Sequence, residues 1–434
     1  MVVLPRQTVR RAVAGASGPQ EVGIEGGMHR RVAITGMGIV TAHGIGKSVN
    51  WSRTLAGESG FRPVTLFDAS GYRTRTAGEV KDLPVAEWRR FRSSRLDRAS
   101  RLLRLAFLEA LGDSGWAVDR LSSAAPVVVL GTTLGGMPSG ERYHEAFLRK
   151  GPARARPSLL FDHLAHSQGL HLMEEFGLPG VPRVFTNACA SGTNAVGHAF
   201  RAVRAGECDV AVCGGYDPLC EFVFAGFHSL QALTPDLCRP FDRDRSGMAL
   251  GEGAGVLLLE GMDHARSRGA PVFGEVAGYG ESTDAFHMTR PDPEGKGAAE
   301  AMVSALADAG EEPEAVGYVN AHGTGTPFND AMESAAIRAA MGPEGARVPV
   351  SSTKSMIGHL LGGAGAVEAI LTVQALRDLR LPPNVNCANP DPACGLRIVT
   401  AVEDAPSLSV AISNSFGFGG SNATLVFRRA GGTP

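Results

Sequence analysis

One cysteine stands in a setting that suits covalent acyl chemistry. Cys189 lies in TNACASGTN, between a run typical of a buried strand and a run whose apolar residues recur at helical spacing. Its small neighbours leave room for a thioester to approach the sulfur. The N-terminus of the following helix favours thiolate, which predicts a lowered cysteine pKa, and the backbone N–H of Cys189 can face a developing oxyanion. A buried structural cysteine is the alternative that this segment leaves open.

Two histidines share an unusual context. His322 in NAHGTGT and His359 in MIGHLLGG each follow a predicted strand and stand among glycine and other small or hydroxylated residues. A histidine at the carboxyl end of a strand in an α/β sheet points into the crevice where ligands bind. Either residue alone could be a capping or hydrogen-bonded structural histidine. The shared context favours a common site.

Polar residues near these histidines predict a supporting set. The hydroxyls of Thr324 and Thr326 could bind the amides of an extended substrate, although a pair of turn-forming threonines is the alternative. Lys354 stands five residues before His359. A buried ammonium needs a carboxylate partner, and Glu333 is the first candidate; a surface lysine is the alternative.

The segment SVAISNSFGFGGSNATLVF predicts two alternating strands joined by a glycine-rich turn with Phe416 and Phe418. Such a turn can present several backbone N–H groups to one point and so provide a second oxyanion donor. A hairpin turn with two inward-packed aromatic rings is the alternative.

These residues need a scaffold, and short Val/Ile/Leu-rich runs alternating with Ala/Leu-rich stretches predict an α/β protein. Strands are expected at 32–35, 126–130, 183–186, 209–213, 255–259, 316–320, 348–351, 409–412 and 424–427. Helices are expected at 96–114, 192–205, 298–309, 331–341 and 363–377. A polar stretch at 261–270 predicts a connection between two comparable halves, 28–270 and 271–434, after a flexible extension at 1–27.

Composition narrows the classes of partner. Apolar residues make up 44% of the 434 residues and the net charge is −2, so no global field favours nucleic acid or an anionic membrane. No apolar run is long enough to span a bilayer, and a cytoplasmic location is expected. The seven cysteines include no C-x-x-C pair, so neither a disulfide framework nor a structural zinc site is expected.

The motifs NACASG, NAHGTGT, TKSMIGH and NSFGFGGSN, in this order, resemble those of the β-ketoacyl synthases over about residues 30–427. They are most similar to elongating ketosynthases of type II fatty-acid and polyketide synthesis. The resemblance implies a thiolase-like fold, a duplicated five-layer α/β/α/β/α arrangement. It also implies a homodimer, or a heterodimer with a subunit like a chain-length factor, and no cofactor or metal.

The resemblance further implies the role of each site residue. Cys189 would take the growing acyl chain from an acyl carrier protein, and His322 and His359 would act on the malonyl thioester of a second carrier protein. The backbone N–H groups of Cys189 and Phe418 would hold the oxyanion. The other implied roles are an ordering ion pair between Lys354 and Glu333, phosphopantetheine binding by Thr324 and Thr326, substrate contact by Phe416, and gating by Phe418.

The resemblance suggests that one basic stretch of the sequence docks acyl carrier proteins, because carrier proteins are acidic. The arginines expected to dock them are Arg89, Arg90, Arg92, Arg95 and Arg98. A solvated helix face is the alternative.

His359 argues for elongation, since initiating synthases carry Asn there, and Cys189 argues against a non-catalytic chain-length partner. The segments PSLLFDHLAHSQGLHLMEEFG and YDPLCEFVFAGFHSLQAL differ from those expected of a housekeeping enzyme. They favour a type II polyketide ketosynthase. Housekeeping fatty-acid elongation is the close alternative, and a non-catalytic partner subunit is the more distant one.

Overall fold

The computed structural model describes residues 30–84, 96–342 and 345–431. Within them, a twelve-stranded sheet has the order β13-β11-β10-β15-β16-β9-β1-β8-β7-β5-β6, with β2 paired to β1. The five principal strands of the N-terminal half are β1 (Val32–Thr41), β5 (Val127–Gly131), β6 (Arg183–Phe185), β7 (Val210–Asp217) and β8 (Gly253–Gly261). Strand β5 runs parallel to β6 and β7, whereas β8 runs antiparallel to β7 and β1.

The C-terminal half repeats this pattern. Its principal strands are β9 (Gly274–Thr283), β10 (Val316–Asn320), β11 (Pro349–Ser351), β15 (Val410–Gly417) and β16 (Ser421–Arg429). Numbered within each half, both follow the order third, second, fourth, fifth, first, with the same strand directions. A short antiparallel pairing of β1 with β9 joins the halves. The fold is therefore duplicated.

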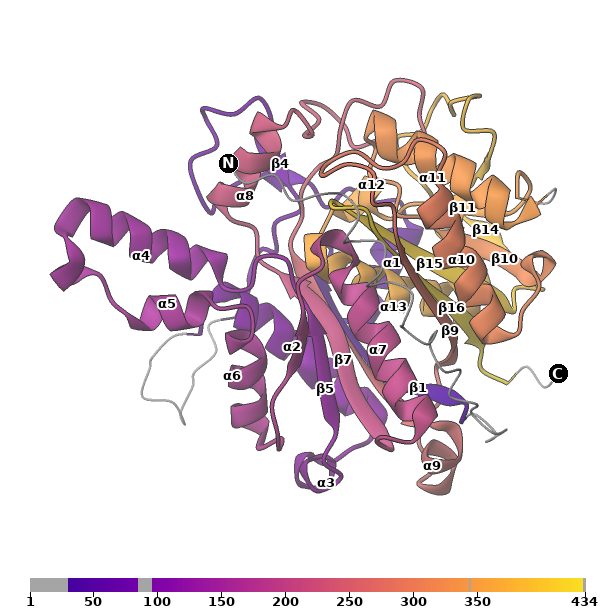
Figure 1. The fold of residues 1–434 in the computed structure, drawn as a ribbon, viewed down its shortest axis with the longest axis horizontal. Coiled ribbons are helices and arrows are strands. Elements are labelled where there is room, and N and C mark those ends of the chain that lie inside the picture. The colour runs from indigo at the N-terminus through magenta and orange to yellow at the C-terminus, as the bar shows by residue number, and fades with distance from the viewer. Residues whose placement is uncertain (1–29, 85–95, 343–344, 432–434) are drawn as a thin grey trace, which may run out of the picture.

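Two helices fill the space between the halves (Figure 1). Helix α7 (Ser191–Ala205) and helix α13 (Ala364–Asp378) pack on each other and on strands of both halves. Thirteen successive residues of α13, from Ala364 to Leu376, are buried, as expected for a helix covered on all sides. A Cβ at Gly192 would lie 2.7 Å from the oxygen of Gly362, so glycine permits the close approach of the start of α7 and the turn that precedes α13.

The outer faces carry their own helices. Helix α2 (Arg98–Ser114) packs on β1 and β8, while α10 (Lys296–Ala309) packs on β9 and β16 and contacts α11 (Pro327–Ala340). The sequence of layers is thus helix, sheet, helices, sheet, helix. The expected five-layer thiolase-like arrangement is confirmed.

An arm formed by α4 (Met137–Lys150) and α5 (Ser158–His163) projects from the body (Figure 1). It exposes several large apolar side chains: Phe147, Leu148, Leu160 and Phe161. The remaining helices are α1 (Lys47–Leu55), α3 (Val118–Ser123), α6 (Ser167–Phe176), α8 (Glu221–Ser229), α9 (Met262–Ser267) and α12 (Lys354–Ile357). Short strands are β2 (Gly44–Ile45), β3 (Arg62–Pro63), β4 (Thr76–Ala77), β12 (Arg380–Leu381), β13 (Arg397–Ile398) and β14 (Glu403–Asp404).

All nine predicted strands and all five predicted helices overlap observed elements. The largest helix error is at α11, which begins four residues earlier than expected because the side chain of Thr326 caps it. Strand β9 lies outside the predicted strand ranges, and eight helices lie outside the predicted helix ranges: α1, α3, α4, α5, α6, α8, α9 and α12. The boundary between halves near residue 270 stays a prediction, and residues 1–27 lie outside the described part. In that part, no helix is both long and apolar enough to cross a membrane.

Candidate active site

The nucleophile candidate lies on a sharp elbow between β6 and α7. A single 3-10 turn, Ala188–Ala190, carries Cys189, and Ala188 has a φ of +47°, in the left-handed region. The Ser191 hydroxyl ties the elbow: it donates to the Ala188 carbonyl at 2.6 Å and accepts the Asn187 N–H at 2.8 Å. The elbow therefore presents the Cys189 sulfur at the base of a cavity.

The Cys189 sulfur contacts groups that come from the C-terminal half. The Nε2 atom of His359 lies 3.0 Å from the Cys189 Sγ, and the backbone N–H of Phe418 donates a hydrogen bond to the sulfur. Burial raises the pKa of Cys189 to about 12, although the positive charge of Lys354 opposes this rise. The expected lowered pKa was wrong: only 8% of Cys189 is exposed, and loss of hydration outweighs the favourable neighbours. The resting group is a thiol, whose proton can pass to His359.

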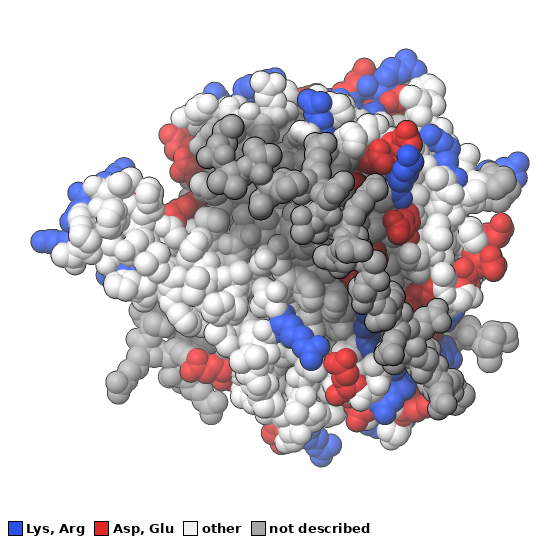
Figure 2. All heavy atoms as spheres, viewed as in Figure 1, with Lys and Arg blue, Asp and Glu red and all other residues white. Residues whose placement is uncertain are grey.

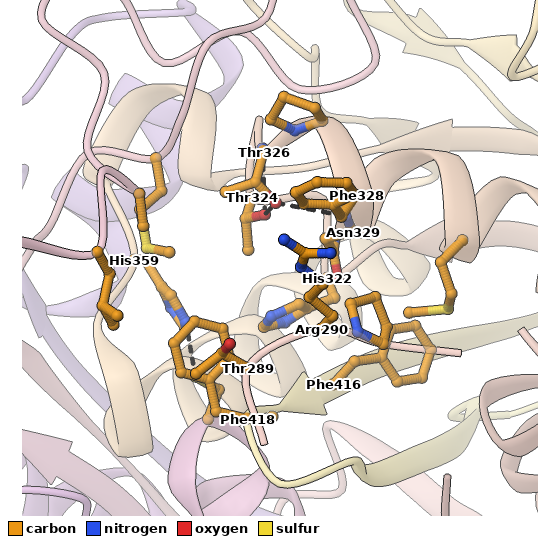
Figure 3. A pocket seen from close by; sticks show the side chains of 18 of the residues that line it. Thr289, Arg290, His322, Thr324, Thr326, Phe328, Asn329, His359, Phe416 and Phe418 are labelled. Atoms are coloured by element: carbon orange, nitrogen blue, oxygen red, sulfur yellow. Dashed lines mark hydrogen bonds between the residues drawn. The ribbon is translucent and has the colours of Figure 1, made fainter. Parts of the chain in front are cut away.

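The two histidines lie together. His322 follows β10 and His359 follows α12, and their ring centroids are 5.1 Å apart at an interplanar angle of 83°. Burial, followed by the charge of Lys354, lowers the pKa of both rings well below the usual value, so both are neutral near pH 7. In the described part of the chain, neither Nδ1 atom has a hydrogen-bond partner. Figure 3 shows both residues lining one pocket.

The expected partner of Lys354 was wrong. The Lys354 ammonium pairs with Glu368, near the start of α13, and both side chains are buried. Glu333 instead accepts the backbone N–H groups of His322 at 2.8 Å and Gly323 at 2.7 Å, and so fixes the loop that carries His322. Burial raises the pKa of Glu333 to about 7. One sequence signal was overlooked: Glu368 is an acidic residue inside the small, apolar run GAGAVEAI, where a buried charge needs a partner.

A cavity of about 330 Å³ leads to these groups, and Cys189 and both histidines line it. On one side, the hydroxyls of Thr324 and Thr326 lie 2.9 Å apart. The ring of Phe416 packs 5.9 Å from that of His322. The ring of Phe418 is 36% exposed and lies 5.7 Å from that of Phe227. All the predicted substrate-binding residues therefore line one cavity (Figure 3).

Sequence reasoning missed other residues that line the cavity. They include Phe227, Thr289, Arg290 and Phe328. The guanidinium of Arg290 lies over the ring of Phe328, 5.3 Å from its centroid. Phe227 and Phe328 lie in segments that the sequence analysis quotes, but neither residue was singled out. Thr289 and Arg290 lie in a loop without regular structure, and only the fold brings them to the cavity.

Comparisons with known proteins agree with this geometry. The beta-ketoacyl synthase N-terminal domain matches residues 29–265, and the C-terminal domain of the same family matches residues 273–388. The chain belongs to the β-ketoacyl synthase family. The expected enzyme class, a condensing acyltransferase, is confirmed.

Relatives match this β-ketoacyl synthase over most of its length. It is 40% identical to 3-oxoacyl-[acyl-carrier-protein] synthase 2 of Synechocystis sp. over 408 residues, which are 92% of this chain and 98% of the relative. Identity to the enzyme of the same name from Vibrio cholerae is 40% over 410 residues, covering 92% and 99%.

Solved structures agree closely as well. The ishigamide ketosynthase/chain length factor superposes with a TM-score of 0.87 at 37% identity, covering 93% of this chain and all of that one. A beta-ketoacyl synthase from Burkholderia phymatum gives 0.86 at 33% identity, covering 92% and 100%.

The structure tests only one of the five arginines of this β-ketoacyl synthase that were predicted to dock carrier proteins. Arg89, Arg90, Arg92 and Arg95 lie outside the described residues. The prediction for Arg98 is corrected: its guanidinium binds the buried Glu252 carboxylate and the Val80 carbonyl, and its side chain is only 18% exposed. Its charge is therefore neutralised inside the fold. Figure 2 shows other basic side chains at the tip of the arm formed by α4 and α5.

Cys189, His322 and His359 could also hold a metal ion, since their ligand atoms lie within 4.8 Å of one another. Two features oppose this in the β-ketoacyl synthase. A thiolate ligand is disfavoured when burial raises the cysteine pKa to about 12, and the charge of Lys354 acts on all three residues. The chemistry of this donor set therefore fits acyl transfer better than metal binding.

Proposed function

We propose that this β-ketoacyl synthase joins acyl groups by decarboxylative condensation, with Cys189 as the nucleophile. The observation that carries the proposal is the 3.0 Å contact between the Cys189 sulfur and Nε2 of His359, at the base of a cavity that His322 also lines. A nucleophile paired with a base beside an oxyanion donor is what acyl transfer requires.

The first step transfers an acyl group from the thioester of an acyl carrier protein to Cys189. As the sulfur attacks the carbonyl carbon, its proton passes to Nε2 of His359. The backbone N–H groups of Cys189 and Phe418 hold the oxyanion, because that of Phe418 already points at the sulfur. The C–S bond to the carrier then breaks, and its thiol leaves with the proton from His359.

The second step uses a malonyl thioester. Loss of CO₂ leaves an enolate, whose oxygen accepts hydrogen bonds from the neutral imidazoles of His322 and His359. The enolate carbon attacks the acyl carbonyl, a C–C bond forms, and the bond to sulfur breaks. The Cys189 thiolate regains a proton from solvent by way of His359. Thr324 and Thr326 bind the amides of the phosphopantetheine arm along the cavity wall.

For the pathway, we favour type II polyketide elongation in the cytoplasm. The likeness to the ishigamide ketosynthase/chain length factor supports this. A chain from the solved complex of a type II PKS acyl-carrier protein with its ketosynthase is also similar to this protein, with a TM-score of 0.84 at 28% identity. The apolar side chains exposed on α4 and α5 fit contact with a second subunit, either another copy or a subunit like a chain-length factor. The carrier proteins would dock at Arg89, Arg90, Arg92 and Arg95.

Fatty-acid elongation is the second candidate, and the 40% identity to 3-oxoacyl-[acyl-carrier-protein] synthase 2 of two bacteria favours it. A non-catalytic partner subunit has less support, because it would lack the nucleophile that Cys189 provides here.

The test is intact-mass spectrometry after incubation with acyl-loaded carrier proteins, beside Cys189→Ala. A mass gain on wild type alone supports the nucleophile, and a preference for polyketide over fatty-acid carrier proteins supports the pathway. Acylation of the Cys189→Ala variant, or of neither protein even with a chain-length-factor-like partner, would overturn the proposal.

A further inference from the structure

A buried carboxylate on the N-terminal half lies near the site without touching the cavity. Asp217 is the last residue of β7 and is completely buried. In the described part of the chain no cation pairs with it. Instead it accepts hydrogen bonds from the Thr132 hydroxyl at 2.5 Å and from the backbone N–H groups of Thr133, Leu134 and Gly362, at 2.9, 2.8 and 2.6 Å.

These donors belong to two segments that the reaction must hold in place. Thr132, Thr133 and Leu134 form the loop after β5, and the Thr133 hydroxyl donates to the Ala188 carbonyl at 3.0 Å. Ala188 is the left-handed residue directly before Cys189. The fourth donor, Gly362, lies in the 3-10 turn Leu361–Gly363, three residues after His359. Asp217 thus bridges the elbow in one half and the histidine loop in the other.

The charge of Asp217 works against the nucleophile, because it raises the pKa of Cys189. A carboxylate that hinders thiolate formation needs another reason to stand there, and its four donors supply one. Two carboxylate oxygens accept four hydrogen bonds readily, whereas an amide would turn its own donors toward N–H groups.

We propose that Asp217 is a positioning residue that keeps the Cys189 sulfur and the His359 imidazole at reacting distance across the two halves. This inference rests on the proposed function of Cys189. Acyl transfer is sensitive to such placement, since a displacement of about 1 Å can cost roughly a hundredfold in rate.

The experiment compares Asp217→Asn with wild type in two assays. We expect acyl transfer to Cys189 to slow by about ten- to a hundredfold, as followed by intact mass. We also expect the pH profile of iodoacetamide alkylation of Cys189 to move to lower pH, since a negative charge is lost. Slower acyl transfer despite an easier loss of the thiol proton would assign the defect to the placement of the sulfur and not to the supply of thiolate.

Glu260→Gln is the matched control. Glu260 is equally buried and accepts hydrogen bonds from Thr35, Trp116 and Arg268, none of which lines the cavity. It should leave both readouts of the folded protein unchanged. Thr133→Val, with Thr133→Ser as its conservative partner, tests the same link without touching the carboxylate. Thr133→Val should slow acyl transfer about fivefold, and Thr133→Ser should retain the wild-type rate.

Acylation of the wild-type protein in the same assay tests the proposed role of Cys189 independently of Asp217. Asp217→Asn acylated at the wild-type rate would then overturn the positioning inference alone. If Asp217→Asn does not fold, the Thr133 pair decides: equal rates for Thr133→Val and wild type overturn the inference, and a loss restored by Thr133→Ser supports it.

Discussion

The two halves of the molecule hold the loop after their second strand in the same way, yet only one uses that loop for chemistry. In the N-terminal half, Asp217 accepts the N–H groups of Thr133 and Leu134 after β5. In the C-terminal half, Glu333 accepts those of His322 and Gly323 after β10. Both carboxyls are buried, and burial raises the pKa of Asp217 to about 6 and that of Glu333 to about 7.

The loops after the third strands correspond as well. Cys189 lies between β6 and the central helix α7, and His359 lies between β11 and the central helix α13. The duplicated backbone therefore brings two equivalent loops together, and residue type alone makes one the nucleophile and the other its proton acceptor. The scaffold sets position, and the side chain at that position sets the chemistry.

The largest expected effects are those of replacing the two histidines, and they should fall on different steps of the reaction. His359→Ala should slow acylation of Cys189 by about a thousandfold, because the sulfur loses the base 3.0 Å away. His322→Ala should leave acylation near the wild-type rate and slow condensation by a similar factor. Single-turnover acylation and product formation, measured separately, distinguish the two. Equal loss of acylation in both variants would contradict the assignment.

The buried ion pair belongs to the C-terminal half. Among the ion pairs of the described residues, Lys354 and Glu368 are the pair whose side chains are both 2% exposed or less. Lys354→Met should lower the free energy of unfolding by about 3–5 kcal/mol, because Glu368 is left as an uncompensated buried charge.

Denaturant unfolding of Lys354→Met measures this loss, and Lys354→Met with Glu368→Leu should regain most of the stability. Failure of the double variant to regain stability would show that the ammonium acts through other contacts.

The raised pKa values of the two buried carboxyls, Asp217 and Glu333, predict that the stability of the protein depends on pH. A carboxyl with a raised folded pKa binds its proton more tightly in the folded state, so stability falls as pH rises between the unfolded and folded values. For Glu333 this window runs from 4.5 to about 7, and for Asp217 from 3.8 to about 6. Thermal unfolding across pH 4–8 should show a shallower decline for Glu333→Gln and Asp217→Asn in their own windows. Variants that follow the wild-type slope would contradict the raised pKa values.

The smallest expected effect is at Phe418. Phe418→Ala removes a partly exposed ring and its contact with Phe227, worth about 1 kcal/mol, but keeps the backbone N–H at the sulfur. Acylation should therefore change by less than about fivefold. Stopped-flow or mass-resolved acylation measures it, and a loss as large as that of His359→Ala would assign the ring itself a part in acyl transfer.

Local patterns predicted much of the site. The strand-to-helix elbow around Cys189 and the turns around both histidines could be located because apolar periodicity marks the elements on either side. The partner of Lys354 was predicted wrongly because the choice favoured Glu333, close to His322 in sequence, over Glu368, whose apolar surroundings in α13 marked it as a buried charge in need of a partner. The pKa of Cys189 was wrong for a related reason: burial depends on residues far away in sequence.

The cavity residues Thr289 and Arg290 escaped prediction because they lie in a loop without regular structure. Helix α4 was not predicted although its sequence is amphipathic, and its projection from the body depends on packing that local sequence does not specify. Arg98 was misassigned because a row of arginines looks alike in sequence, whereas in the fold this one has a buried partner in Glu252.

The pairing of β1 has a consequence for synthesis of the chain. All ten residues of this strand are buried, and apart from the short adjacent β2 its neighbours in the sheet are β8 and β9, about 210–240 residues further along. On a ribosome adding 5–20 residues per second, β1 would wait about 10–40 s for a partner. Throughout that interval an apolar, unpaired strand is exposed on the nascent chain, and we expect it to be the segment that molecular chaperones bind first.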